Sequence, residues 1–395
     1  MSARPAILRG ATVTATAGLL LVGLTMAPGA PAAGPGAPEA EPLAFLGVLD
    51  GRTERSLLLA DTTTGAQREL AGSAGAASPT WSPDGLRIAW IAPEADGRPG
   101  HVVVADADGS TAPRSVGPAD GESTAVAWSS TGDLYWFARS ARTDVDCSDP
   151  AGAPALGLHV LHRDGGPVER LLDVPQTARD LTVAPDGATL AWRDSGAGTP
   201  LCDAAQDRVV LLDLATRTPV AVTGAPTAGG GVSWSGDGDR LVLSTGADLV
   251  LVDVATATAV LLPTPDARET SPEFAADSSA IAVLRTTATG TDIALHRPDG
   301  SFGRVVAATT TRDEELAWTP DGTALAVYGS VRDTACAADP SCPWPALAPA
   351  IRIQALDGSA PAPVSSAVSL TVPQMTFAPV LPDAPVLPGR PRGIH

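Results

Sequence analysis

The sequence predicts an all-β protein, and three observations support this fold class. A hairpin motif recurs along the chain, each copy is followed by further short apolar strands, and no helical pattern of useful length separates them. Repeats of roughly 40–50 residues with four strands each are typical of the blades of a β-propeller. We therefore expect a single β-propeller over residues 43–380.

The recurring hairpin is clearest between Trp81 and Trp90. Trp81 ends one strand, and Pro83, Asp84 and Gly85 follow as a tight turn. Proline presets φ, aspartate bonds to its own backbone, and glycine accepts positive φ at no steric cost. The six copies begin at Trp81, Trp128, Val183, Trp234, Phe274 and Trp318.

Further strands complete each unit. Third strands are expected at residues 101–105, 209–213, 250–253 and 293–297, and fourth strands at 259–262 and 304–306. One blade cannot bury both of its faces, so the large apolar residues of each copy should pack between neighbouring blades.

The two ends of the chain predict how the ring closes. Residues 373–379 read as a first strand with no successor, and residues 43–49, 56–61 and 67–70 read as second, third and fourth strands with no first. Together they predict a seventh blade built from both termini, which would remove the open sheet edges. The alternative is six blades preceded by an irregular segment.

The hairpin resembles the TolB-type, WD40-like propeller repeat, and the copies from Trp81 to Trp90 and from Trp318 to Val327 match it best. This resemblance covers nearly the whole chain after residue 42. It implies a propeller fold. The family includes envelope proteins that bind protein partners as well as propellers attached to peptidases.

The first residues have the pattern of a secretory signal. Arg4 and Arg9 precede an apolar run, and small residues around Ala32 offer a cleavage site. We expect a signal peptide over 1–32, with an uncleaved anchor as the alternative, then a Pro/Gly/Ala-rich tether over 33–42. Residues 381–395 are expected to form a disordered tail.

Charge and composition restrict the partners. The formal net charge is −18, and no arginine cluster is visible in the sequence. Nucleic acids and anionic membranes need a basic footprint, so we expect neither as the main partner, and no membrane span beyond the N-terminal segment. We expect a monomer that binds a protein or peptide, with no cofactor and no metal.

Four cysteines in an exported chain predict two disulfides. All four lie in long insertions between the second and third strands of blades. Cys147 and Cys202 lie on adjacent blades, and Cys336 and Cys342 are close in the sequence. We therefore expect Cys147 to pair with Cys202 and Cys336 with Cys342. Spacings typical of zinc ligands are absent.

The links between blades share one rim with these insertions, and they carry the candidate binding residues. These are Arg179, Asp180, Arg268, Glu269, Arg312, Asp313, Glu314 and Glu315. Asp180 and Glu315 should point at the mouth of the central channel. A solvated rim is the ordinary interpretation of such charges.

The functional hypothesis is an exported binding scaffold that holds a protein or peptide on this rim. The alternative is a propeller enzyme, lactonase-like or lyase-like, with its site at the channel mouth. Asp180, Glu314 and Glu315 are its candidate carboxylates. No known catalytic motif supports the enzyme directly.

Overall fold

The structure is a computed structural model that describes residues 42–47, 54–62, 64–94, 99–117, 122–139, 156–194, 208–224, 232–264, 266–309, 312–332, 347–365 and 375–377. All of these belong to one compact unit, Ala40–His395. In these ranges no helix is long and apolar enough to cross a membrane. The predicted signal peptide, the tether up to residue 41 and the C-terminal tail lie outside the described residues, whereas Pro42, expected as the last tether residue, begins the first strand.

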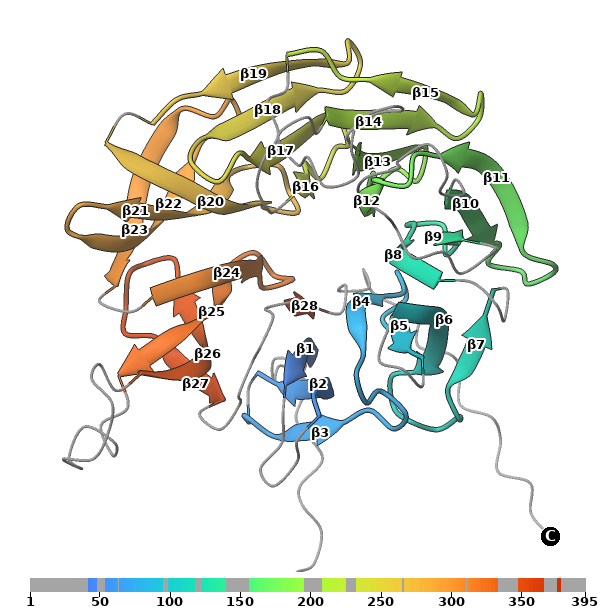
Figure 1. Ribbon diagram of the computed structural model, residues 1–395. Helices are drawn as coiled ribbons and strands as arrows, with labels where there is room; N and C mark the ends of the chain where they lie inside the picture. Colours follow the sequence, from blue (N-terminus) through green and yellow to red (C-terminus); the bar gives the residue numbers. More distant parts are fainter. Residues whose placement is uncertain are drawn as a thin grey trace, which may run out of the picture. The chain divides into compact units, whose positions relative to one another are not determined.

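Seven four-stranded antiparallel sheets form the unit, which confirms the expected seven blades. They surround a common centre, and the inner strand of each sheet lies nearest to it (Figure 1). The seven sheets, each from its inner to its outer strand, consist of β28 (Met375–Phe377), β1 (Pro42–Gly47), β2 (Ser56–Asp61) and β3 (Gln67–Glu69); β4 (Ala77–Trp81), β5 (Arg87–Pro93), β6 (Pro99–Asp106) and β7 (Arg114–Val116); β8 (Glu122–Trp128), β9 (Leu134–Arg139), β10 (Leu156–Leu161) and β11 (Glu169–Val174); β12 (Arg179–Val183), β13 (Thr189–Asp194), β14 (Arg208–Asp213) and β15 (Thr218–Ala221); β16 (Val232–Trp234), β17 (Arg240–Ser244), β18 (Leu249–Asp253) and β19 (Thr258–Leu262); β20 (Ala267–Phe274), β21 (Ile281–Thr287), β22 (Gly290–His296) and β23 (Phe302–Thr309); β24 (Arg312–Trp318), β25 (Ala324–Arg332), β26 (Leu347–Ala355) and β27 (Ala362–Ser365).

The blade built from both termini is present. Strand β28 pairs with β1 in antiparallel register, with Leu43 opposite Phe377 and Phe45 opposite Met375. The first and last described strands are therefore hydrogen-bonded neighbours in one sheet. This arrangement covers an edge of β1 that would otherwise be free to pair with another chain.

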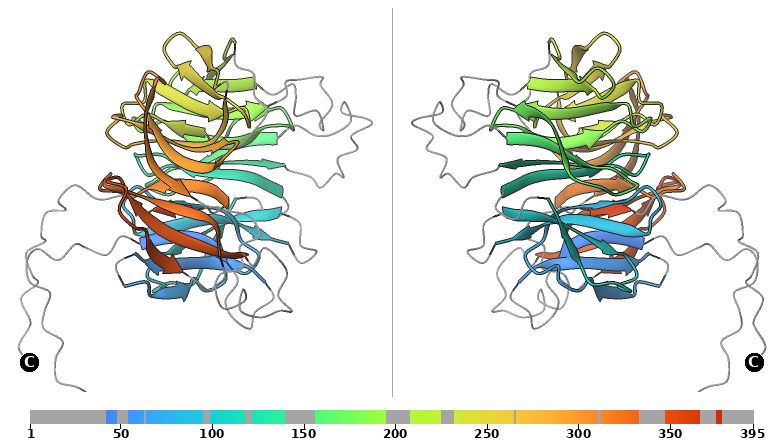
Figure 2. Two further views of the ribbon diagram at one scale, coloured as in Figure 1. Left: turned by 90° about the vertical axis from the view of Figure 1, so that its left-hand side faces the viewer. Right: turned by 90° about the vertical axis from the view of Figure 1, so that its right-hand side faces the viewer.

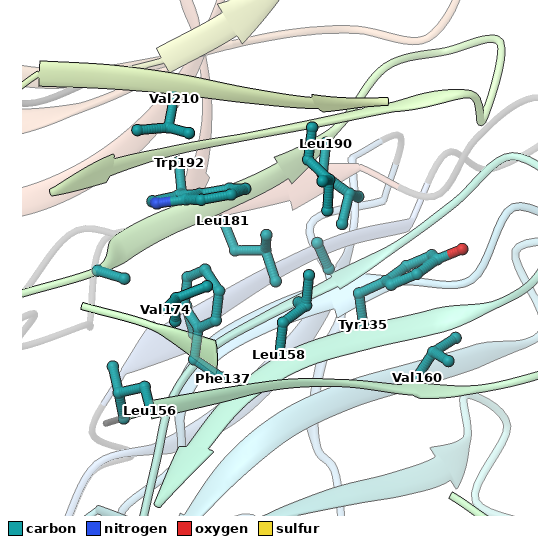
Figure 3. Packing of buried hydrophobic residues seen from close by; sticks show 14 residues of the cluster. Tyr135, Phe137, Leu156, Leu158, Val160, Val174, Leu181, Leu190, Trp192 and Val210 are labelled. Atoms are coloured by element: carbon teal, nitrogen blue, oxygen red, sulfur yellow. The ribbon is translucent and has the colours of Figure 1, made fainter. Parts of the chain in front are cut away.

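Seven apolar clusters hold the ring together, and each lies between two neighbouring blades. Side chains alternate between the faces of a strand, so one strand serves two clusters. Ile88 packs toward the blade of β1, and the adjacent Ala89 packs toward the blade of β8. Between the blades of β9 and β13, Phe137 meets Trp192 edge-on with centroids 6.0 Å apart (Figure 3).

The hairpin motif is built as its sequence predicts. In the first copy, Gly85 has φ of +65° and donates its N–H to the Ser82 carbonyl at 2.9 Å. One Asp84 oxygen accepts from Leu86 N–H, and the Ser82 hydroxyl bridges to Arg87. The Ser82 hydroxyl also donates to Asp84. The Ser235 and Thr319 hydroxyls donate to Asp237 and Asp321 in the same way, so the repeated aspartates stabilise turns.

Candidate functional site

The inner strands are irregular at the point where they face the centre of the ring. Register shifts interrupt their pairing in five blades, as in β4 between Ala77 and Thr80 and in β12 between Arg179 and Thr182. Ser78, Asp180 and Ser271 adopt φ of +52°, +56° and +50° at these bulges. Bulges change the direction of individual side chains, and here they turn residues of β4 and β12 to the channel wall.

A cavity of about 440 Å³ lies within the ring of inner strands. It is lined by Ser78, Pro79, Thr80, Val126, Ala127, Trp128, Asp180, Leu181, Thr182, Val183, Val232, Glu315 and Met375. These residues come from six of the seven inner strands, so the cavity is the central channel. Its wall contains two carboxylates and, in the part of the chain that the structure describes, no basic side chain.

Asp180, predicted at the channel mouth, does line this cavity. Its Oδ2 accepts from Arg193 Nε at 2.7 Å and lies 3.8 Å from Arg179 Nε. The Arg193 side chain is only 7% exposed. Asp180 therefore has its charge partner already within its own blade.

Glu315, the second residue predicted at the mouth, lies in a different environment. Its Oε1 accepts the Met375 N–H at 3.0 Å, which joins β24 to the terminal strand β28. Its Oε2 is buried and has no hydrogen-bond partner among the described residues. Burial raises the pKa of this carboxyl to about 7, although the Met375 N–H opposes the shift.

A third carboxylate, Glu273 on β20, lies close enough for the charge of Glu315 to act on it. Burial raises the pKa of Glu273 to about 8, a hydrogen bond from Ser233 opposes this rise, and the Glu315 charge adds to it. The Glu273 carbonyl accepts from Trp318 Nε1 at 2.9 Å, which fixes β20 against β24.

The sequence prediction missed Glu273, although a signal for it exists. Glu273 directly precedes the aromatic that ends its inner strand. The equivalent residues in the other five hairpin copies are all uncharged: Thr80, Ala127, Thr182, Ser233 and Ala317. A comparison of the copies column by column would have identified the one charged residue at this position.

Two of the predicted rim residues are buried in pairs within a blade. The Asp313 side chain is fully buried and accepts from Arg352 Nη2 at 2.7 Å. The Glu269 carboxylate is 1% exposed and accepts from His296 at 2.9 Å and from Thr264 Oγ1 at 3.1 Å. These pairs hold strands together inside their blades.

Other predicted residues lie at the surface of this rim. Arg268 is exposed and donates from Nε to the Gly246 carbonyl at 3.0 Å. Glu314 is exposed, and its carbonyl accepts from Ser271 at 2.9 Å. The Arg312 side chain and all four cysteines lie outside the described residues, so the disulfide pairing stays a prediction.

A second cavity, of about 580 Å³, lies between the blades of β2 and β5 and is bordered by Leu59, Trp81 and Leu86. Its polar side chains already have hydrogen-bond partners. Arg68 donates to the Ala107 carbonyl, and Asp106 accepts from Thr111 at 2.6 Å. The channel differs because Glu315 in its wall has a buried acceptor without a partner in the described part of the chain. Across the described ranges, no group of three or more His, Cys, Asp or Glu side chains could hold a metal ion.

Comparison with known proteins identifies solved structures whose fold is similar to that of this chain. No protein-family model and no curated protein sequence matches the chain. A solved prolyl endopeptidase is similar at 12% identity and a TM-score of 0.56, over 84% of this chain and 50% of that one. Oligogalacturonate lyase from Vibrio parahaemolyticus is similar at 14% identity and a TM-score of 0.54, over 73% and 82%.

TolB from Acinetobacter baumannii is also similar, at 14% identity and a TM-score of 0.47, over 86% of this chain and 83% of that one. The chain itself is a seven-bladed β-propeller in fold. Similarity at such low sequence identity shows the fold alone.

Proposed function

We propose that this propeller is an exported binding scaffold that holds a protein or peptide at the channel mouth and on the surrounding rim. The observation that carries the proposal is Glu315, which lines a cavity of about 440 Å³ at the centre of the ring and whose buried Oε2 has no hydrogen-bond partner among the described residues. Leaving a buried acceptor unpaired costs free energy, which a bound ligand would recover.

The ring suits a scaffold because its site is held by many strands. Seven interblade cores fix the inner strands, and hydrogen bonds from Trp318 and Met375 tie β24 to β20 and β28. A preformed site loses little conformational entropy when it binds. Figure 2 shows the blades stacked around the ring from two sides. Export is proposed from the signal pattern of residues 1–32.

The test is selection of peptides from a random display library on the purified chain, in parallel with Glu315→Gln. The proposal expects enriched peptides that bind the native chain and lose affinity for the variant. Glu122→Gln is the control, because Glu122 begins β8 on the same rim and pairs with Arg139 outside the cavity wall. Peptides that bind all three proteins equally, or no enrichment at all, would contradict it.

An enzyme is the second candidate, and two carboxyls on neighbouring inner strands favour it. Glu273 and Glu315 have pKa values of about 8 and 7, near the range in which a carboxyl exchanges protons at neutral pH. Oligogalacturonate lyases are among the similar structures. The purified chain should then form an unsaturated product from oligogalacturonate, followed by ultraviolet absorbance, and Glu315→Gln should abolish it. No absorbance change with the native chain would exclude this substrate.

A further inference from the structure

We propose that the cavity receives a basic side chain of the bound partner, a lysine ammonium or an arginine guanidinium, with Glu315 as its counter-ion. This inference rests on the proposed function, because a bound polypeptide would present the cation. It specifies the kind of side chain that the channel would bind.

The unpaired oxygen is the first argument. Glu315 is held from one side, where Oε1 accepts the Met375 N–H, and its other oxygen has no partner in the described chain. A backbone amide supplies one neutral donor to a carboxylate that can accept several. Charge-assisted hydrogen bonds from an ammonium or guanidinium are stronger than neutral ones, and Oε2 offers an unused acceptor for one.

The distribution of charge is the second argument. The cavity wall holds Asp180 and Glu315 and, among described residues, no basic group. Asp180 is already neutralised by Arg193. Among the described residues Glu315 has no such charge partner, and its own charge also acts on the buried Glu273 carboxyl of β20. A cation beside Glu315 would offset the negative charge that acts on Glu273 and would lower the pKa of Glu315.

The rest of the wall selects an organic cation. Val126, Leu181, Val183 and Met375 supply apolar surface beside the carboxylates. Lysine and arginine carry an apolar stem behind a charged head, so one side chain satisfies both parts of the wall. A calcium ion would need six to eight oxygen ligands, whereas the described residues contain no group of three or more acidic, histidine or cysteine side chains that could hold a metal.

The experiment uses N-acetyl-arginine amide as the probe and N-acetyl-citrulline amide as its uncharged isostere. Binding to the full chain is measured by isothermal titration in two buffers of different ionisation enthalpy. The expected result is binding of the arginine probe with proton release at pH 7, and no binding of citrulline. Glu315→Gln should weaken the arginine probe by about tenfold or more, the scale of one charge-assisted hydrogen bond.

Two variants guard against a folding artefact. Glu315→Asp keeps the charge and should bind better than Glu315→Gln. Asp173→Asn removes an exposed carboxylate on the outer strand β11, away from the cavity wall, and should bind like the native chain. Asp173→Asn should also melt as the native protein does.

Several outcomes would overturn the inference. Equal binding of the arginine and citrulline probes would overturn it, and so would the binding of neither probe. Arginine binding that Glu315→Gln leaves unchanged would also overturn it. Calcium chloride binding that depends on Glu315, without binding of the arginine probe, would replace the proposal with a metal site. Selected peptides that need Glu315 but lack basic residues would sink this inference and leave the proposed scaffold standing. Probe binding without any selected peptide would support this inference and contradict the proposed scaffold.

Discussion

Glu315 and Glu273 are two carboxyls whose pKa values are raised by burial. Both carboxyls belong to inner strands, and their pKa values rise from 4.5 to about 7 and about 8. Between pH 4.5 and about 8 the folded chain therefore holds more protons than the unfolded chain at these two groups. For these groups, the free energy of unfolding falls as pH rises through this window.

The pH dependence of stability tests this reasoning. Glu315→Gln removes one raised pKa and the repulsion that it exerts on Glu273, so the decline in unfolding free energy from pH 5 to about pH 7 should become shallower. Urea unfolding at several pH values measures it, with Glu314→Gln as the exposed control. An unchanged slope in Glu315→Gln would mean that the carboxyl titrates normally in the folded chain.

Trp234 tests the packing between blades at the scale of one side chain. It is 8% exposed and packs in the cluster between the blades of β13 and β17, together with Leu241 and Val209. Trp234→Ala should lower the free energy of unfolding by roughly 3–5 kcal/mol, because it deletes a buried aromatic and leaves a cavity.

Urea unfolding compares Trp234→Ala with Leu86→Ala. Leu86 is 65% exposed, so its truncation should change the free energy of unfolding by less than about 0.5 kcal/mol. A loss under about 1 kcal/mol for Trp234→Ala would show that this tryptophan does not hold the two blades together.

At the scale of the element, the hairpin turn depends on one backbone conformation. Gly322 has φ of +68° and donates to the Thr319 carbonyl at 2.8 Å. A Cβ added there would meet no atom within 4 Å, so any cost of substitution comes from the backbone alone. Gly322→Ala should therefore destabilise the protein by about 1–2 kcal/mol.

Asparagine supplies the matched comparison, because it tolerates the left-handed region better than alanine does. Gly322→Asn should cost less than Gly322→Ala when both are followed by thermal unfolding. Equal losses for the two variants would indicate that a contact of the glycine, and not its φ, sets the cost.

The strands and turns could be predicted from the sequence, but the partners of its charges could not. Hairpins at Trp81 and Trp318 carry local signals, because each turn is specified by neighbouring residues. The pair of Asp313 with Arg352 joins residues that are far apart in the sequence, on β24 and β26. Such a contact depends on strand register and on which face a side chain takes at a bulge, and neither is written in the local pattern.

At the scale of the whole molecule, the ring is closed by three described residues, Met375–Phe377. They pair with β1, and Met375 packs with Leu43, Phe45 and Tyr328 in the core that joins the first and last blades. Met375 also supplies the N–H that holds Glu315. The stability of the ring and the geometry of the channel therefore depend on the same short strand.

Removal of β28 should therefore lower the stability of the ring and change the geometry of the channel. A chain truncated after Ser365 loses the strand, exposes the edge of β1, and should melt at least about 5 °C lower and self-associate through that edge. A chain truncated after Val380 keeps β28 and should match the full chain. Calorimetry measures the melting temperature and light scattering measures the association. If the shorter chain melts like the full one and stays monomeric, then β28 does not close the ring, and the support that Met375 gives to Glu315 must come from elsewhere.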